Sequence, residues 1–391
     1  MDKLSKSVKI ISLIVSIAVI GYIFPKIVEM VKPGLGTMVF FTMYFAVIIL
    51  AFTLSFASAG IVSLRKIKNN VDYNEIQGIY NELLTKHKKE LDKYRVPIII
   101  KRIIQMLCVC FIFIMAMDGD IGFTKGMSLQ SIELLQRVAH ISIPLFIISC
   151  VIKTKSEKMY RKLYKEKVIG ALIKKVGKDL TYVADSEEKS TILNKYAKAD
   201  FDVSSYNRST VDDYITGCLD DGHPVSMANL DLKRVTGSGK NRRVTEIFGG
   251  MFVNITASKN VGAIVKILTN RNAKHSKMDV FDKKCEKLEM DSQAFEKYFN
   301  VYSDNKIIAM QIITSDILEM LTEFRKNYGI ELEIAIDKNH IYLRFHTGAM
   351  FEAKTFGGSI RKKDLVTYYG VLKMITMLSK RINEAVENTN I

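Results

Sequence analysis

The sequence predicts a multi-pass α-helical membrane region, with four helices in two hairpins, followed by a cytosolic α+β domain with an antiparallel sheet. Residues 33–64 contain no Asp, Glu, Lys, Arg or His. This run exceeds the roughly 20 apolar residues that an α-helix needs to cross a bilayer. Charge separates the two parts: residues 1–178 hold 27 Lys and Arg against 12 Asp and Glu, whereas residues 179–391 hold 30 against 29. The second part therefore has the balanced composition of an ordinary globular domain.

The first predicted membrane hairpin covers residues 1–64. Its first helix, about 10–24, follows three lysines, and its second helix is about 38–64. A secretory signal peptide begins in the same way, but no small-x-small cleavage site follows Phe24. We therefore expect the first helix to remain uncleaved.

Residues 65–102 predict a cytoplasmic, basic, amphipathic helix. Its apolar side chains recur at spacings of three, four and seven, which places them in one stripe. Such a helix needs a partner or a membrane surface against which to bury the stripe. The stripe consists of Ile76, Ile79, Tyr80, Leu83, Leu84, His87, Leu91 and Tyr94.

The second predicted hairpin covers residues 103–152, with apolar runs at 103–117 and 138–152. Fifteen residues are short for a full crossing, although flanking Lys and Arg side chains can reach the interface. A re-entrant hairpin remains the alternative. The segments on one side of these four helices hold twenty Lys and Arg near the membrane ends, and the opposite loops hold four. The positive-inside rule therefore predicts a multi-pass protein of the cell membrane with both termini in the cytoplasm.

Residues 153–178 predict a basic juxtamembrane helix. Basic residues near an anionic lipid surface contribute about 1 kcal/mol each, so this helix is a candidate for contact with the anionic inner leaflet. Packing against the stripe of residues 76–94, or a solvated connector, are the alternatives. The candidate lipid-headgroup contacts are Lys153, Lys155, Lys158, Arg161, Lys162, Lys165 and Lys167.

Residues 179–391 predict the cytosolic α+β domain. Helical periodicity predicts helices at 186–199, 307–327 and 364–387. Alternation predicts strands at 225–235 and 244–257, with a bulge at Gly249-Gly250, and a hairpin of 330–336 with 341–345. The stretch Gly237-Ser-Gly-Lys240 resembles the end of a phosphate-binding loop, but Asn241 replaces the hydroxyl residue and the first glycine is missing. We interpret it as a hairpin turn.

No residue spacing predicts a reaction, a cofactor or a metal site. The five cysteines form no C-x-x-C pair and the six histidines show no ligand spacing. Adjacent carboxylates at Asp212-Asp213 and Asp220-Asp221 are interpreted as solvated turns. The basic excess lies in residues 1–178, which favours lipid over nucleic acid as a partner. The sequence thus favours a non-enzymatic protein.

Residues 295–304, Phe-Glu-Lys-Tyr-Phe-Asn-Val-Tyr-Ser-Asp, resemble the signature of a bacterial membrane family, domain of unknown function 3137. Further matching segments are 164–169, 180–182, 213–217, 248–252 and 350–352. The resemblance implies a membrane-anchored protein with a cytosolic α+β domain and, as a partner, a LemA-type membrane protein; it implies no activity. The signature residues with an expected structural role are Phe295, Phe299, Val301, Tyr302, Ser303 and Asp304.

Two functional hypotheses follow. The first is a non-enzymatic scaffold or adaptor of the bacterial inner membrane, whose cytosolic domain docks a partner. The second is a lipid-binding or lipid-sensing protein that uses a small curved sheet at residues 225–257 beside the bilayer. Bound lipid in the purified domain would distinguish the second from the first.

Overall fold

The computed structural model describes residues 73–116, 155–183, 189–201, 206–270 and 285–389, with isolated positions between 137 and 147. The chain divides into two compact units. Unit one contains Asp92–Tyr160 and Thr355–Gly357, together with Met1–Arg65. Unit two contains Lys66–Leu91, Arg161–Lys354 and Gly358–Ile391.

The prediction of a four-helix membrane region is contradicted. Among the described residues, no helix combines the length and the apolar character that a bilayer crossing requires. The finding also contradicts the multi-pass topology and the cell-membrane localisation. The expected helices 10–24 and 38–64 lie outside the described residues, as does most of 117–152.

Helix α3 (Tyr73–Ala116) contains the beginning of the third expected crossing, 103–117, and shows a physical reason there. It runs without interruption through the predicted boundary at residue 102, and Lys101 and Arg102 interrupt its apolar character. In the sequence, the run without charged residues lies between Arg102 and Asp118 and comprises residues 103–117. At about 1.5 Å per residue, such a run covers about 22 Å as a helix, whereas the hydrocarbon core is about 30 Å thick.

Unit one, as far as it is described, is held by a few polar contacts around α3 and the first residues of α6 (Lys155–Leu163). Lys101 Nζ lies 3.5 Å from Glu157 Oε1, and Arg95 donates from Nε to the carbonyl of Thr355 at 2.8 Å. Tyr160 is buried there, and burial raises the pKa of its phenol to about 12.

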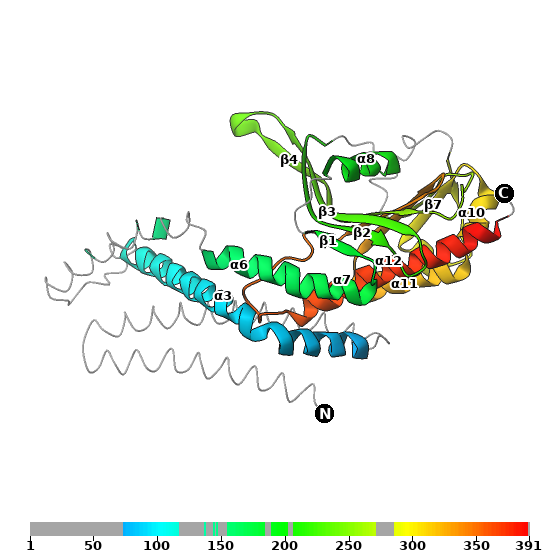
Figure 1. Ribbon diagram of the computed structural model, residues 1–391. Helices are drawn as coiled ribbons and strands as arrows, with labels where there is room; N and C mark the ends of the chain where they lie inside the picture. The colour runs from blue at the N-terminus through cyan, green and yellow to red at the C-terminus, as the bar shows by residue number, and fades with distance from the viewer. Residues whose placement is uncertain are drawn as a thin grey trace, which may run out of the picture. The chain divides into compact units, whose positions relative to one another are not determined.

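Unit two is built on one antiparallel sheet in the order β1-β2-β3-β4-β9-β8-β5-β7-β6 (Figure 1). All neighbouring strands pair antiparallel. The sheet therefore grows from hairpins at β2–β3–β4 and β8–β9, and β5 adds beside β8. The strands are β1 (Thr181–Val183), β2 (Arg208–Cys218), β3 (Pro224–Thr236), β4 (Arg243–Thr256), β5 (Val265–Thr269), β6 (Glu286–Leu288), β7 (Phe299–Ser303), β8 (Glu331–Asp337) and β9 (His340–His346).

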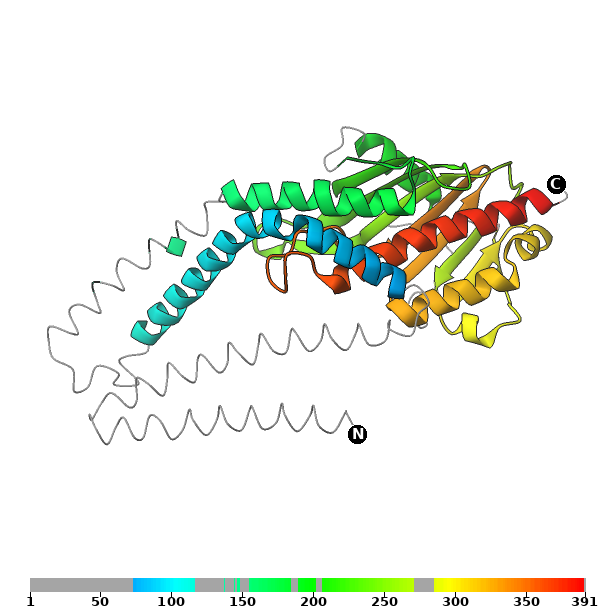
Figure 2. The same ribbon diagram turned by 60° about the horizontal axis from the view of Figure 1, so that its bottom comes forward.

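Helices cover both faces of this sheet (Figures 1 and 2). One face carries α7 (Gly170–Val176), α11 (Ser315–Tyr328) and the long α12 (Lys362–Asn388), and the other carries α8 (Lys189–Ala199). The α12 face is apolar, with buried side chains such as Val253, Ile334 and Leu343. The face covered by α8 has an apolar cluster of its own, which includes Tyr196 of α8 and Phe248 and Phe252 of β4. The sheet is thus buried on both sides, which stabilises it without a second sheet.

The two predicted hairpins are confirmed. β3 and β4 pair from Val225↔Ile255 to Thr236↔Arg243, and β8 and β9 pair from Glu331↔His346 to Asp337↔His340. The predicted bulge at Gly249-Gly250 is wrong: the register shifts opposite Leu232/Lys233, where Ile247 is left unpaired. Gly250 is required for another reason. Its φ is 153°, and a Cβ at this position would lie 2.0 Å from the carbonyl oxygen of Phe345.

The predicted helix 307–327 is two helices, α10 (Lys306–Ile312) and α11. Ile313 leaves the helical region and Thr314 adopts an extended conformation before α11. Ile312 and Ile313 are β-branched, and Thr-Ser-Asp follows them. The Thr, Ser and Asp side chains can form hydrogen bonds with nearby backbone groups, which favours the start of a new helix over continuation of the first. The sequence periodicity alone did not distinguish one bent helix from two.

Like most of the predicted stripe, residues 161–178 of the basic segment belong to unit two. Its helix contains a π-helical turn, η1 (Tyr164–Ile169), followed by α7. Ile76, Ile79, Leu83 and Leu91 of α3 are buried, and Lys175 Nζ lies 3.0 Å from Glu82 Oε2. The Lys175–Glu82 pair therefore links this segment to the helix that carries the stripe.

We expect His87 to make the stability of unit two depend on pH. Burial, followed by Lys86 and Lys167, lowers the pKa of His87 from 6.5, while Glu90 opposes this. A base whose pKa is lowered by folding favours its neutral form, so its stabilising contribution is complete above pH 6.5 and is lost as the pH falls below it. Urea unfolding of His87→Leu should therefore lose less free energy between neutral pH and about pH 5 than the natural protein. The control variant Asn81→Leu, at an exposed position of the same helix without a titratable group, should retain the natural pH dependence.

Candidate functional site

The family-signature residues build a structural corner. Ser292 caps α9 (Gln293–Glu296) by accepting from the amide of Phe295. Phe295 and Phe299 stack with ring centroids 5.0 Å apart and are both buried, as is Val301. Tyr302 is half-buried on the α8 side of β7. These aromatic contacts fix the direction in which the chain passes from helix to strand.

The polar end of the signature joins two strands and starts a helix. Ser303 Oγ donates to the carbonyl of Ile264, and Asp304 Oδ1 accepts from the amide of Ile264, each at 2.8 Å. Asn305 then caps α10 by accepting from the amides of its first turn. The sequence predicted a helix start near residue 307, and the side chain that caps this helix is Asn305. Every contact of this corner is internal to the fold.

The candidate lipid contacts separate into two groups. Lys155, Lys158, Arg161, Lys162 and Lys167 are exposed, and Lys153 lies outside the described residues. Lys165 is buried in the π-helical turn, and its Nζ lies 2.7 Å from Asp213 Oδ1. Lys165 therefore faces the protein interior, while its neighbours in sequence face outward.

Lys165, Asp213 and Tyr182 form a buried polar cluster. Tyr182 Oη donates to Asp213 Oδ1 at 2.5 Å, and the Asp213 side chain has no exposed surface. Burial raises the pKa of the Asp213 carboxyl, whereas Lys165 and Tyr182 lower it. Burial and the negative charge of Asp213 both raise the pKa of Tyr182 far above its usual range. The ion pair thus exists in a place where neither charge would be stable alone.

Two local departures from regular backbone bring the cluster together. Asp213 has φ 56° at the point where the β2–β3 register shifts, between Asp212 and Ile215. The extra residue of a bulge turns a side chain to the opposite face of a sheet. On the other side, a π-helical turn widens the helix at Lys165, a feature that concentrates at functional positions. The interpretation of Asp212-Asp213 as a solvated turn was therefore wrong, because a bulge inside a strand has the same local sequence signature.

Segments that carried the family resemblance meet around this cluster. Phe351 contacts the ring of Tyr182 and, at 5.0 Å between centroids, that of Tyr368.

A pocket of about 210 Å³ lies between β2, β3, β4 and the loop after β9. Asn229 supports that loop: with its amide oriented to suit its neighbours, it donates to Gly348 and Gly250 and accepts from Met350. The pocket is lined by carboxylates from Asp212, Asp231, Glu246 and Glu352.

The pocket carboxylates do not form a metal centre. Within the part of the chain that the structure describes, no group of three His, Cys, Asp or Glu side chains is placed to hold a metal ion. Asp231 already pairs with Lys233 at 2.5 Å, and Glu352 lies 4.0 Å from Arg161. The lining suits a cationic side chain better than a metal ion.

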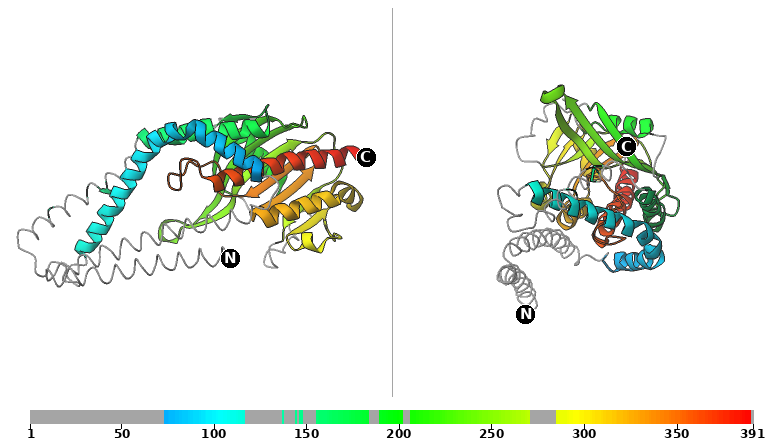
Figure 3. Two further views of the ribbon diagram at one scale, coloured as in Figure 1. Left: turned by 90° about the horizontal axis from the view of Figure 1, so that it is seen from below. Right: turned by 90° about the vertical axis from the view of Figure 1, so that its left-hand side faces the viewer.

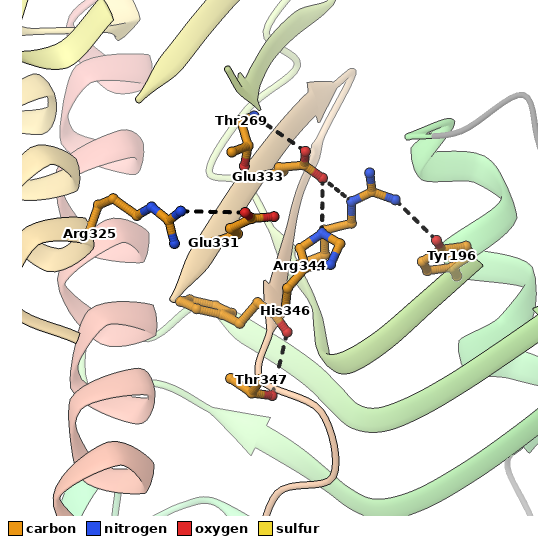
Figure 4. A network of polar contacts seen from close by, with 9 residues as sticks. Tyr196, Thr269, Arg325, Glu331, Glu333, Arg344, His346 and Thr347 are labelled. Atoms are coloured by element: carbon orange, nitrogen blue, oxygen red, sulfur yellow. Dashed lines mark hydrogen bonds and ion pairs between the residues drawn. The ribbon is translucent and has the colours of Figure 1, made fainter. Parts of the chain in front are cut away.

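A second buried network lies on the α8 face of the sheet (Figure 4). Glu333 pairs with Arg344 and accepts from the amide of Thr269 at 3.3 Å. Arg344 donates to Tyr196 Oη at 3.2 Å, so it links the sheet to α8. The guanidinium also lies 4.6 Å from the ring centroid of Phe201.

His346 extends this network toward the surface: its Nε2 lies 3.3 Å from Glu333 Oε2 (Figure 4). Glu333 and Arg344 are almost fully buried, so the network anchors α8 and does not form an open site. The sequence analysis did not single out either residue. An Arg and a Glu in the middle of two otherwise apolar strands were the available signal, because buried charges in such strands require each other.

A groove between α11 and α12 is lined by both apolar and charged side chains. It has a volume of about 240 Å³. Its apolar lining includes Met320 and Phe324 of α11 and Met374 and Met377 of α12, and Met377 is 43% exposed. Its charged lining consists of Asp316, Glu319 and Glu323 of α11 and of Lys373 of α12, which pairs with Glu75 at 3.4 Å. Figure 3 shows the two helices running side by side along the sheet.

Gly370 sets the shape of this groove. A Cβ at position 370 would lie 2.3 Å from the ring of Tyr328, so only glycine allows this ring to lie against α12. Tyr328 in turn stacks on Phe324 with centroids 5.0 Å apart. The end of the groove is therefore rigid, while the methionine edge is flexible.

Residues 246–384 match a known family. The matching sequence model is DUF3137, a protein family of unknown function. The resemblance noted in the sequence is thereby confirmed for this part of the chain, which includes the groove and the signature corner. No curated protein matches the chain.

One solved structure matches part of the chain. It is the crystal structure of the mycobacterial trehalose monomycolate transport factor A, at 10% sequence identity and a TM-score of 0.31. The match covers 57% of this chain and 95% of that one.

Proposed function

We propose that this protein is a non-enzymatic adaptor whose α11–α12 groove docks a basic amphipathic helix of a partner protein. The observation that carries the proposal is the groove itself, whose lining combines methionine side chains with a row of carboxylates on α11. We favour it over an amphiphile held inside the sheet at residues 225–257, because side chains such as Met227, Phe252 and Ile255 are fully packed inside the fold.

The apolar half of the groove suits a helix with an apolar stripe. Methionine side chains adapt to differently shaped partners, and an amphipathic helix presents anchors at spacings of three, four and seven. A volume of about 240 Å³ receives one or two large side chains of such a stripe. The rest of the helix would lie along α12.

The charged half of the groove selects a basic partner. Asp316, Glu319 and Glu323 are spaced by three and four residues, so their carboxylates line one side of α11. Arg381 pairs with Asp316 at 3.4 Å, at one end of the row. Glu319 and Glu323 are exposed and remain available for Lys or Arg side chains of the partner. Such charges steer association and fix orientation more than they add affinity.

The test uses two synthetic peptides of Leu and Lys with the same composition, one amphipathic and one scrambled, titrated into the full chain by calorimetry. The chain has a net charge of +16, so bulk electrostatics repel both peptides. We expect the amphipathic peptide alone to bind. The double variant Glu319→Lys with Glu323→Lys should weaken this binding at least about tenfold, because it replaces attraction by repulsion at the groove.

The matched control is Glu286→Lys with Glu289→Lys, which changes the net charge equally on exposed residues near the edge of the sheet. This variant should bind the amphipathic peptide as the natural protein does. Equal binding of the scrambled peptide, or an unchanged affinity in the groove variant, would contradict the proposal.

A further inference from the structure

The hairpin of β3 and β4 extends beyond the rest of the sheet. β2 pairs with β3 only as far as Lys233, and β9 pairs with β4 only along residues 251–256. The last pairs of the hairpin, from Lys233↔Glu246 to Thr236↔Arg243, therefore have no neighbouring strand on the β4 side. Figure 1 shows this hairpin projecting from the sheet.

The end of this hairpin is strongly basic. Residues 233–243 include five Lys or Arg and no Asp or Glu, although residues 179–391 as a whole are nearly neutral. All residues from Thr236 to Glu246 are exposed. The basic residues are Lys233, Arg234, Lys240, Arg242 and Arg243.

Apolar surface accompanies the charge. Val235 and Val244 are paired directly across the hairpin, and Val244 is 53% exposed. An apolar pair at the base of a basic tip makes the hairpin amphiphilic. Basic and apolar groups on one projecting element match the two parts of an anionic phospholipid interface, the headgroup charge and the upper acyl region.

The hairpin is held rigid up to its tip. The side chain of Asn207 both accepts from the amide of Val235 and donates to its carbonyl, each at 2.8 Å. Gly237, with φ 74°, makes the turn, because an added Cβ there would lie 2.4 Å from the carbonyl oxygen of Asn241. The basic side chains are therefore presented on a fixed frame, and little backbone entropy is lost when they bind.

From these observations we infer that the tip of the β3–β4 hairpin binds the surface of anionic phospholipid, with Lys240, Arg242 and Arg243 on the headgroups and Val244 at the level of the upper acyl chains. A nucleic acid fits less well, because residues 233–246 carry no aromatic side chain for base stacking. The inference goes beyond the proposed adaptor function, since the groove is formed by other elements.

The chain contains no tryptophan, so one introduced tryptophan reports on its own surroundings. Val244→Trp places this reporter on the hairpin, where a Trp–Val cross-strand pair is favourable. The full chain with this substitution is mixed with vesicles of pure phosphatidylglycerol or pure phosphatidylcholine. We expect the emission to shift to shorter wavelength with phosphatidylglycerol only, and the shift to disappear in high salt because surface charges are screened.

Two further variants test which basic residues cause the emission shift. In the Val244→Trp background, Lys240→Gln with Arg242→Gln and Arg243→Gln should weaken the response to phosphatidylglycerol by about 100-fold, at about tenfold or less for each removed charge. The control Lys306→Gln with Lys326→Gln and Lys380→Gln removes the same charge from exposed helix positions and should leave the response unchanged.

A separate reporter, Ile307→Trp, stands on an exposed residue of α10 and should show no shift. An equal shift at position 307, an equal response to phosphatidylcholine, or a response of the hairpin to duplex DNA but not to vesicles would each overturn the inference.

Discussion

Replacing Lys165 by methionine is expected to lower the free energy of unfolding by about 3 to 5 kcal/mol near neutral pH, the usual cost of removing one partner of a buried ion pair. Lys165 is the cation 2.7 Å from Asp213, whose side chain has no exposed surface. Without it, the carboxylate keeps only the hydroxyl of Tyr182 as a partner for Oδ1, and Oδ2 accepts no hydrogen bond from the described residues. Urea unfolding monitored by circular dichroism measures the loss.

The pH dependence of this loss identifies its cause. In Lys165→Met the pKa of Asp213 should rise further, because burial already raises it and Lys165 is the main group that opposes the rise. An acid whose pKa is raised by folding is most stable in its protonated form, so the loss should shrink as the pH is lowered from 7 toward about 5. A loss that is independent of pH would indicate a packing defect instead of an unpaired charge.

A second substitution should repair much of the damage. Asn at position 213 removes the charge, can still accept from Tyr182, and tolerates the positive φ of 56° better than most residues. Lys165→Met with Asp213→Asn is therefore expected to be more stable than Lys165→Met alone. The matched control is Lys162→Met, at an exposed pair 3.8 Å from Glu166, which should change stability by about 0.5 kcal/mol or less.

Replacing Arg344 by methionine should also cost about 3 to 5 kcal/mol, for the same electrostatic reason and for lost packing. Arg344 neutralises buried Glu333, donates to Tyr196 and lies against Phe201. Because Tyr196 belongs to α8, we expect this helix to be the first element to lose protection. Hydrogen exchange of residues 189–199, compared with that of α12, measures this local effect.

A double-mutant cycle separates charge from packing at this site. Arg344→Met with Glu333→Leu leaves no unpaired charge and should recover most of the stability that Arg344→Met loses. Lys380→Met, at an exposed pair with Glu384, is the control and should be nearly neutral. If the double variant were no more stable than Arg344→Met, the lost packing of Arg344 on Phe201 would be the dominant contribution, because removing the unpaired charge would have recovered nothing.

The sequence determined the elements whose signals are local. Alternation placed β3, β4, β8 and β9, and helical periodicity placed α12, within one or two residues of their observed bounds at nearly every end. Among the signature residues, Phe295 and Phe299 stack inside the fold. Each of these signals depends on neighbours within a few turns or one hairpin, and such contacts are encoded in the order of polar and apolar residues.

Hydropathy alone was not sufficient for the membrane region. Apolar runs predicted four crossings, but the one at 103–117 begins inside α3, a helix with Lys101 and Arg102 before its apolar end. A run of apolar residues has the same composition whether it meets lipid or protein. Its surroundings therefore need to be known before it is assigned.

Only the tertiary structure decided which distant residues form sites. Lys165 was grouped with exposed lysines and Asp213 with a solvated turn, because neither residue has a local pattern that marks it as buried. A π-helical turn and a one-residue bulge bring them within 2.7 Å, and each of these departures changes the face on which a side chain lies. The same holds for the groove, where α11 and α12 contribute carboxylates and methionines that are far apart in the chain. Local periodicity specifies the elements, whereas the pairing of their faces follows from packing across the whole sheet.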